Sequence, residues 1–352
     1  MRRVLNGLML EGGSIVINNP ERRALRKHMN AAVKMSNALV WLSSLMAMLA
    51  LVVVGTGLFW QDGGGPFSFT SLHGQTVQMY GQGLYRNDTL FSAGTFKGTD
   101  TVTLFVAIPL LMFSILRYHR GSLRGGLLLT GTLAYFLYNA ASMAFGAAYN
   151  SLFLVYIAYF STSLFAFVLA WTSIDLEALP DHISAGLPHR GIANFLIAGG
   201  LVLAFIWLSE IIGPLVEGQV PRGLGAYTTM FTHALDTAVI TPVLILAGVL
   251  LLRRAALGYL LASTLLVLCT LVGIMVVAQT IAQSLVGVEL SMGQFIGIVG
   301  SFVVMGLIAS WLTVALLRHI LDSAPVRAAR EAPADRMAAR SIHIIPADGR
   351  PR

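Results

Sequence analysis

The chain has 352 residues, of which 56% are hydrophobic and only 11% are charged, and its mean hydropathy is +0.75. Soluble domains carry about a quarter charged residues, so this composition excludes an ordinary soluble protein and indicates a polytopic membrane protein. The net charge of +7 does not indicate a nucleic-acid partner, because the basic residues flank apolar segments. A single cysteine, Cys269, excludes an intrachain disulfide and a CxxC metal or redox motif.

Eight segments are long and apolar enough to cross a bilayer as helices, which takes roughly 20 residues each. None of them alternates with the period of two that a β-strand shows. The N-terminal residues lack the pattern of a cleaved signal peptide. The predicted spans are 36–60, 101–118, 123–148, 151–173, 191–214, 228–252, 256–285 and 292–318.

The basic residues predict the orientation of these spans. With the N-terminus inside, 20 of the 23 Lys and Arg residues fall on the cytoplasmic side, and only Arg86, Lys97 and Arg222 fall outside. This strong bias follows the positive-inside rule and predicts a bacterial inner-membrane protein with both termini cytoplasmic.

The spans group into a predicted all-α architecture of two parallel four-helix halves with short flanking segments. The expected parts are a basic N-terminal segment at 1–35, a first half at 36–175 with an outer loop at 61–100, a cytoplasmic linker at 176–190, a second half at 191–318, and a disordered cytoplasmic tail at 319–352. The basic segment is either a helix on the anionic inner leaflet or a flank that sets topology. The tail is rich in Ala, Pro and Arg.

An internal repeat is the basis for the two halves. When Pro109 is aligned with Pro242, Arg120 meets Arg253 and a glycine five residues later meets another glycine. "DT" at Asp100 and "DT" at Asp236 also correspond, with a three-residue offset. Each proline predicts a kinked helix, and parallel repeats of this kind occur in transporter folds.

Polar residues gather toward the predicted outer ends of the spans. Asp236 lies about 25 Å above the inner end of its span, at 1.5 Å per residue, with His233 nearly one turn further out. Asp100 is expected at the start of the second span, where an N-cap role is an alternative. Glu210 lies near the outer end of the fifth span, and Gln279 and Gln283 share one face of the seventh.

The third span carries a stripe of polar residues at three- and four-residue steps. We predict that this stripe and the outer acids line one water-filled pocket, with Arg86 in the loop above it. An acid within a span is a functional hypothesis by default, although interfacial pairing, aromatic belts and interhelical glue explain parts of the pattern. The candidate ligand-binding residues are Asp236, His233, Asp100, Glu210, Asn139, Tyr135, Tyr138, Tyr149, Gln279, Gln283 and Arg86.

Three functions fit such a pocket. The first is binding or transport of a small solute or ion, with the two aspartates as charge partners or proton carriers. The second is a membrane-embedded enzyme for a lipid or isoprenoid, in which His233 and Asp236 share a proton. The third is an accessory subunit that uses the small-residue face "GIVGSFVVMGLIAS" of the eighth span for helix contacts or self-association. The motifs identify no family, no metal site and no cofactor.

Overall fold

The computed structural model describes residues 10–11, 14–15, 32–289 and 291–322. Eight of its helical segments are long and apolar enough to cross a membrane, as the sequence predicts. Three of these segments are interrupted by a π-helical turn, labelled η1, η4 and η5. The segments are α2 (Asn37–Phe59), α3–η1–α4 (Leu90–Val102, Thr103–Ala107, Ile108–His119), α5 (Leu123–Gly146), α6 (Phe153–Ser173), α7 (His189–Val216), α8–η4–α9 (Phe231–Leu235, Asp236–Ile240, Thr241–Leu252), α10 (Ala256–Leu285) and α11–η5–α12 (Met292–Gln294, Phe295–Val299, Gly300–Arg318).

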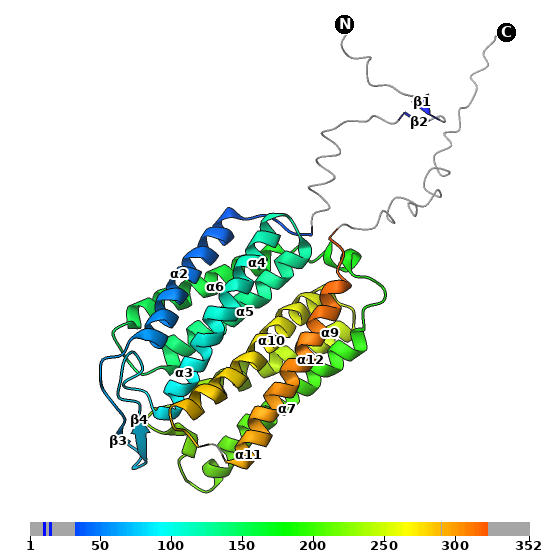
Figure 1. Cartoon of the computed structure of the whole chain (residues 1–352). Helices are drawn as coiled ribbons and strands as arrows, with labels where there is room; N and C mark the ends of the chain where they lie inside the picture. The colour runs from blue at the N-terminus through cyan, green and yellow to red at the C-terminus, as the bar shows by residue number, and fades with distance from the viewer. Residues whose placement is uncertain (1–9, 12–13, 16–31, 290, 323–352) are drawn as a thin grey trace, which may run out of the picture.

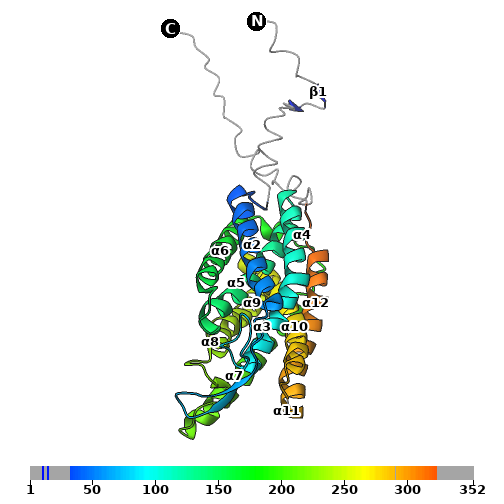
Figure 2. The ribbon, with the colours of Figure 1, turned by 60° about the vertical axis from the view of Figure 1, so that its left-hand side comes forward.

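The helices form two adjoining groups that run along the same long axis (Figures 1 and 2). In the first group α5 packs against α4 and α6, and α2 packs against α6; in the second, α10 packs against α9 and α12, and α7 against α9. The groups meet where α10 packs against α3 and α5. Accordingly α5 and α10 are the most enclosed of the eight segments. In their apolar 18-residue stretches, 72% and 67% of the residues are buried.

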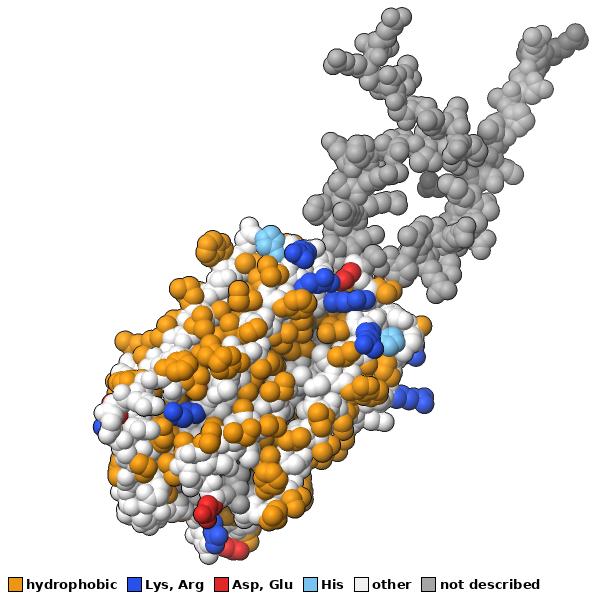
Figure 3. All heavy atoms as spheres, viewed as in Figure 1, with side chains coloured by type: hydrophobic (Ala, Val, Ile, Leu, Met, Phe, Trp, Pro, Cys, Tyr) orange, Lys and Arg blue, Asp and Glu red, His pale blue; other side chains and the backbone are white. Residues whose placement is uncertain are grey.

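The outward surface of the bundle is apolar. Large side chains such as Trp41, Leu154 and Phe205 are exposed on the long helices, and apolar side chains cover most of the face drawn in Figure 3. Exposing such a surface to water would be unfavourable, and exposed apolar patches of this extent indicate contact with a membrane. The protein is therefore a multi-pass membrane protein.

The two ends of the bundle differ. One end carries the hairpins α4–α5 and α9–α10 and the last turn of α12, with Arg117, Arg124, Arg253 and Arg318; we call it the basic end. Figure 3 shows Lys and Arg side chains gathered there. The opposite end carries an antiparallel hairpin of β3 (Phe67–Thr70) and β4 (Thr76–Met79); we call it the hairpin end (Figure 1).

Short elements complete the described chain. A 3-10 turn, η2 (Leu179–His182), joins α6 to α7, and another, η3 (Arg222–Leu224), joins α7 to α8. Two-residue strands β1 (Leu10–Glu11) and β2 (Ser14–Ile15) pair with each other. Most of the predicted basic helix and most of the predicted disordered tail lie outside the described residues. Residues 32–35 are described and are not helical; they pair with the end of α6 through a bridge between Val33 and Ile174. Residues 319–322 are described, and they contact the α6–α7 connection through a bridge between Ile320 and Ile183.

The second span starts earlier than the sequence predicts. α3 begins at Leu90, with the Thr89 side chain accepting the backbone N–H of Ser92 as its N-cap. The outer loop therefore ends before residue 90 rather than at residue 100, and Asp100 lies inside the helix instead of at its N-cap. The extension was missed because Leu90–Thr99 is rich in Gly, Thr and Ser and contains Lys97, so apolar length alone did not reveal it.

This extension packs closely against α10. A Cβ atom on Gly98 would fall within 2.3 Å of the Gln279 Cα atom, so only glycine lets the two backbones approach this closely. The Gln279 and Gln283 side chains donate to Thr99 and Thr95 of α3, at 2.8 Å in both cases. Small residues and side-chain amides are the usual means of helix association in lipid.

We predict that Gly98→Ala destabilises the protein by about 1–3 kcal/mol, the usual cost of overpacking a tight contact, because the α10 backbone cannot yield locally. The apparent melting temperature in mild detergent would measure the loss. Gly55→Ala in α2 is the matched control, because no atom lies within 4 Å of the added methyl group. Equal melting temperatures for the two variants would contradict the prediction.

Candidate functional site

Asp236 is buried between the two groups of helices, at 5% exposure. Its Oδ2 atom accepts a hydrogen bond of 2.9 Å from the indole Nε1 of Trp207 on α7. The hydroxyl of Tyr138 on α5 donates to the same carboxyl group. Both donors are neutral, so the described hydrogen-bonding partners of this buried acid supply no positive charge.

The backbone at Asp236 is irregular. The π-helical turn η4 begins at this residue, and the N–H of Thr241 bonds the Asp236 carbonyl five residues back. Pro242 follows and has no N–H to donate, so the ordinary helical ladder is interrupted at this point. Turns of this kind occur frequently at functional sites.

His233 pairs with a different acid from the one that the sequence suggested. Its Nε2 atom lies 2.9 Å from Glu210 Oε2, and its ring packs 4.1 Å from the ring of Trp207, centroid to centroid. Both His233 and Asp236 contact Trp207, but an indole nitrogen only donates, so Trp207 cannot relay a proton between them. Trp207 was not among the candidate residues, although it lies three residues before Glu210 on the same face of α7.

A cavity of ≈ 40 Å³ adjoins Asp236, which is room for a small number of water molecules. Most of its wall is apolar and comes from five segments of both groups. The lining residues are Tyr138, Leu203, Asp236, Ile240, Leu244, Leu268, Cys269, Val272, Phe302 and Met305.

Asp100 lies in a second buried contact set, within the first group of helices. Its Oδ2 atom accepts a bond of 2.6 Å from the Tyr85 hydroxyl, and its Oδ1 atom has no hydrogen-bond partner among the described residues. A Cβ on Gly57 of α2 would collide with both Asp100 and Tyr85. The aspartate is therefore enclosed between α2 and α3.

The polar stripe of α5 is completed by residues of neighbouring helices. Thr103 Oγ1 lies 2.9 Å from the Tyr135 hydroxyl and accepts a bond of 3.2 Å from Asn139 Nδ2. Asn139 Nδ2 also lies 3.4 Å from the Tyr159 hydroxyl of α6. Two further oxygens in this interior, Asn139 Oδ1 and Ser163 Oγ, are buried without a partner in the described chain.

The remaining candidates lie elsewhere. Gln279 and Gln283 bind α3, as described above, and Tyr149 is largely exposed at the hairpin end. Arg86 pairs with Asp62 at 3.3 Å in the loop rather than lying over the buried acids. The candidates thus divide into several contact sets instead of lining one shared recess: Tyr138 with Asp236, His233 with Glu210, and Tyr135 with Asn139 through Thr103.

A further buried acid lies in the loop before α3 and was not among the candidate residues. Asp88 is buried, and its Oδ1 atom accepts bonds of 2.8 Å from the backbone N–H of Ala148 and from the hydroxyl of Tyr227. It therefore joins the outer loop to the α5–α6 turn and to the α7–α8 connection. Burial raises the pKa of Asp88 to about 7, against the opposing effect of these two hydrogen bonds. No periodicity marks a loop residue as buried, so its burial could not be predicted from the sequence.

His233 and Glu210 are residue types that can ligate a metal ion. In the part of the chain that the structure describes, no group of three His, Cys, Asp or Glu side chains could hold a metal ion. The pairing of His233 with Glu210 is therefore interpreted as a hydrogen-bonded pair on its own.

We predict that Asp88 makes the stability of the protein depend on pH. Its folded-state pKa lies above the ordinary value of 3.8, so its contribution is complete below about pH 4 and is lost as the pH rises through about 7. The change is on the order of 4 kcal/mol. Melting temperatures in detergent from pH 4 to pH 8 should fall over this window, and Asp88→Asn should flatten the curve. Asp62→Asn, which changes an exposed acid, is the control and should keep the wild-type curve of melting temperature against pH. If Asp88→Asn keeps the wild-type curve as well, the pH dependence does not come from Asp88.

Comparisons of the chain with protein-family models, with curated proteins and with solved structures give no match.

Proposed function

We propose that the protein binds, and carries across the membrane, a proton or a small cation at Asp236. The observation that supports this proposal is the buried carboxyl group whose hydrogen-bonding partners, Trp207 and Tyr138, are both neutral. An isolated carboxylate in a low-dielectric interior is unfavourable. Such a group must hold a proton or accept a cation, and ionisable residues within spans commonly serve ion and proton pathways.

The surroundings of Asp236 support a small ligand. The adjoining cavity has a volume of ≈ 40 Å³, which is too small for a large solute, and Asp236 is the one charged residue among the described residues that line it. His233 and Glu210 form a pair toward the more exposed side, where Glu210 is 38% exposed. We propose that this pair attracts the cation before it reaches Asp236.

An internal duplication, which we propose on the positions below, also supports the carrier proposal. Residues 133 positions apart have the same local structure. The π-helical turns begin at Thr103 and at Asp236, and in each case proline is the second residue of the helix that follows. The basic-end hairpins also agree. An added Cβ on Gly125 would meet Arg117 and Tyr118, and one on Gly258 would meet Leu250 and Leu251, which are the equivalent positions.

This alignment refines the comparison of the two aspartates. Asp236 is equivalent to Thr103, and Asp100 is equivalent to His233, one turn nearer the hairpin end in each half. We propose that the two halves carry related but non-identical sites, with Asp236 as the ion site. With the basic end cytoplasmic, as the distribution of Lys and Arg predicts, the hairpin end faces outward.

We predict that Asp236→Asn abolishes ion movement. The chain is reconstituted into liposomes that contain a pH-sensitive dye, and a proton gradient is imposed alone or with sodium, potassium or tetramethylammonium. The wild type should dissipate the gradient with at least one of these probes, and Asp236→Asn should fall to the rate of empty liposomes because the amide takes up no proton near neutral pH and offers a cation no negative charge. Asp62→Asn in the loop should retain the wild-type rate.

The fluorescence of Trp207 provides a second measurement that does not need transport. Because its Nε1 donates to Asp236, the difference spectrum between the wild type and Trp207→Phe should shift when the active probe is added. If Asp236→Asn moves ions at the wild-type rate, Asp236 has no part in the mechanism. If the wild type shows neither ion flux nor a change in Trp207 fluorescence, the proposed function is wrong.

A further inference from the structure

A second cavity lies at the basic end, far from Asp236 along the bundle. Its volume is ≈ 400 Å³, and it opens between α4, α5 and α12. Its lining is divided between three arginines and apolar side chains. The residues are Phe113, Arg117, Arg124, Gly125, Leu128, Val314, Leu317 and Arg318.

The cavity has two tiers. On each of the three helices an apolar residue lies four positions, or about one turn, deeper than an arginine: Phe113 below Arg117, Leu128 below Arg124, and Val314 below Arg318. Residues four apart share one face of a helix. The arginines therefore form a cationic tier at the helix ends, and the apolar residues form a tier about 6 Å further into the membrane.

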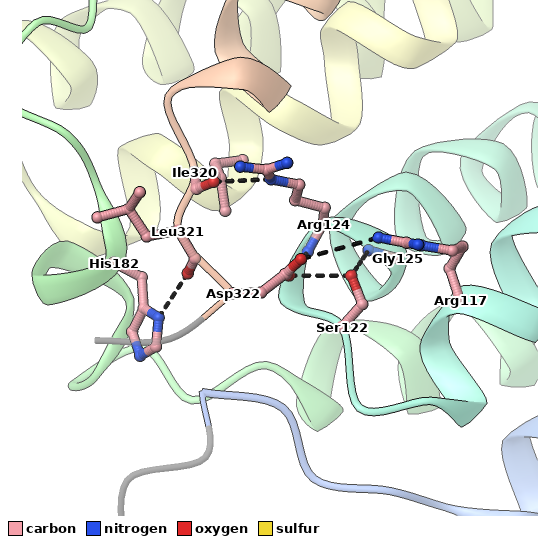
Figure 4. A network of polar contacts seen from close by, with 8 residues as sticks. All are labelled: Arg117, Ser122, Arg124, Gly125, His182, Ile320, Leu321 and Asp322. Carbon is pink, nitrogen blue, oxygen red and sulfur yellow. Dashed lines mark hydrogen bonds and ion pairs between the residues drawn. The ribbon is translucent and has the colours of Figure 1, made fainter. Parts of the chain in front are cut away.

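The cationic tier is only partly neutralised. Asp322 Oδ2 lies 3.8 Å from Arg117 Nη2, a distance that gives a weak pair. Arg124 uses its Nε atom to bind the Ile320 carbonyl at 2.7 Å, and its backbone N–H binds Asp322 (Figure 4). Arg318 is exposed and has no hydrogen bond or ion pair with any residue that the structure describes. Three positive charges thus face one carboxylate.

The apolar tier is open toward lipid. Phe113 and Val314 are about half exposed on the outer surfaces of α4 and α12, and Leu128 lies between them on α5. A chain of methylene groups lying against these side chains would keep its polar end beside the arginines. The arginines at the helix ends and the apolar side chains below them therefore match a ligand that has an anionic head and an apolar chain.

We propose that this cavity binds the phosphate headgroup of an anionic phospholipid, with an acyl chain along Phe113, Leu128 and Val314. Arginine forks bind phosphate oxygens through paired charge-assisted hydrogen bonds, and basic pockets between membrane helices are suited to lipid headgroups. The site is independent of Asp236, so either proposal can fail without the other.

The test uses the full chain in mild detergent and native mass spectrometry. Phosphatidylglycerol is titrated against phosphatidylcholine, glycerol phosphate and inorganic phosphate. The wild type should retain phosphatidylglycerol in preference to the other three. Arg318→Gln should weaken its binding about fivefold, the effect of one surface charge, whereas Arg253→Gln, an exposed arginine at the end of α9, should leave binding unchanged.

A second pair of variants tests the apolar tier without changing charge. Val314→Trp should fill the tier and lower phosphatidylglycerol binding, and Val304→Trp, at an exposed position of the same helix outside the cavity, should not. Equal binding of phosphatidylcholine or of inorganic phosphate would overturn the proposal, as would unchanged binding in both Arg318→Gln and Val314→Trp.

Discussion

Three buried carboxyl groups shape this molecule, and each is held by a neutral aromatic donor. Trp207 and Tyr138 donate to Asp236, Tyr85 donates to Asp100, and Tyr227 donates to Asp88. In a low-dielectric interior a carboxyl group without a hydrogen bond is strongly unfavourable. An indole or phenol meets part of that requirement and is itself compatible with an apolar environment. The acids therefore remain buried without becoming salt bridges.

The positions of these donors connect distant parts of the chain. The bonds to Asp236 join α5 of the first group to α7 and η4 of the second. The bonds to Asp88 join three connections at the hairpin end, one of which leads from α7 to α8. Because the donors come from different segments, protonation of either acid affects contacts between segments rather than within one helix.

Much of the architecture follows from apolar length and from the placement of arginine. The eight spans are predicted to within a few residues except for the second, where glycine and threonine form helix that only the close contact with α10 makes favourable. Periodicity also identifies the polar stripe of α5, because every third or fourth residue lies on one face.

The partners of the polar residues do not follow from the sequence. A helical period states which residues share a face but not which helix lies opposite it, so the bonds of Asp236 to Trp207 and of His233 to Glu210 were not foreseen. Glutamines at one level of the bundle were assigned to a common pocket, although they face α3. Asp88 lies in a loop, where burial depends on the surrounding turns.

The attachment of α12 has a mechanical consequence. Its last turn is fixed at the basic end, where Ile320 and Asp322 bind Arg124 and where His182 Nδ1 lies 2.7 Å from the Leu321 carbonyl. Its opposite end begins with the irregular turn η5. A small tilt about the fixed end moves each residue in proportion to its distance from that pivot. Phe302 and Met305, in the wall of the cavity beside Asp236, lie further from that pivot than Val314, so the same tilt would displace them more than Val314 in the cavity at the basic end.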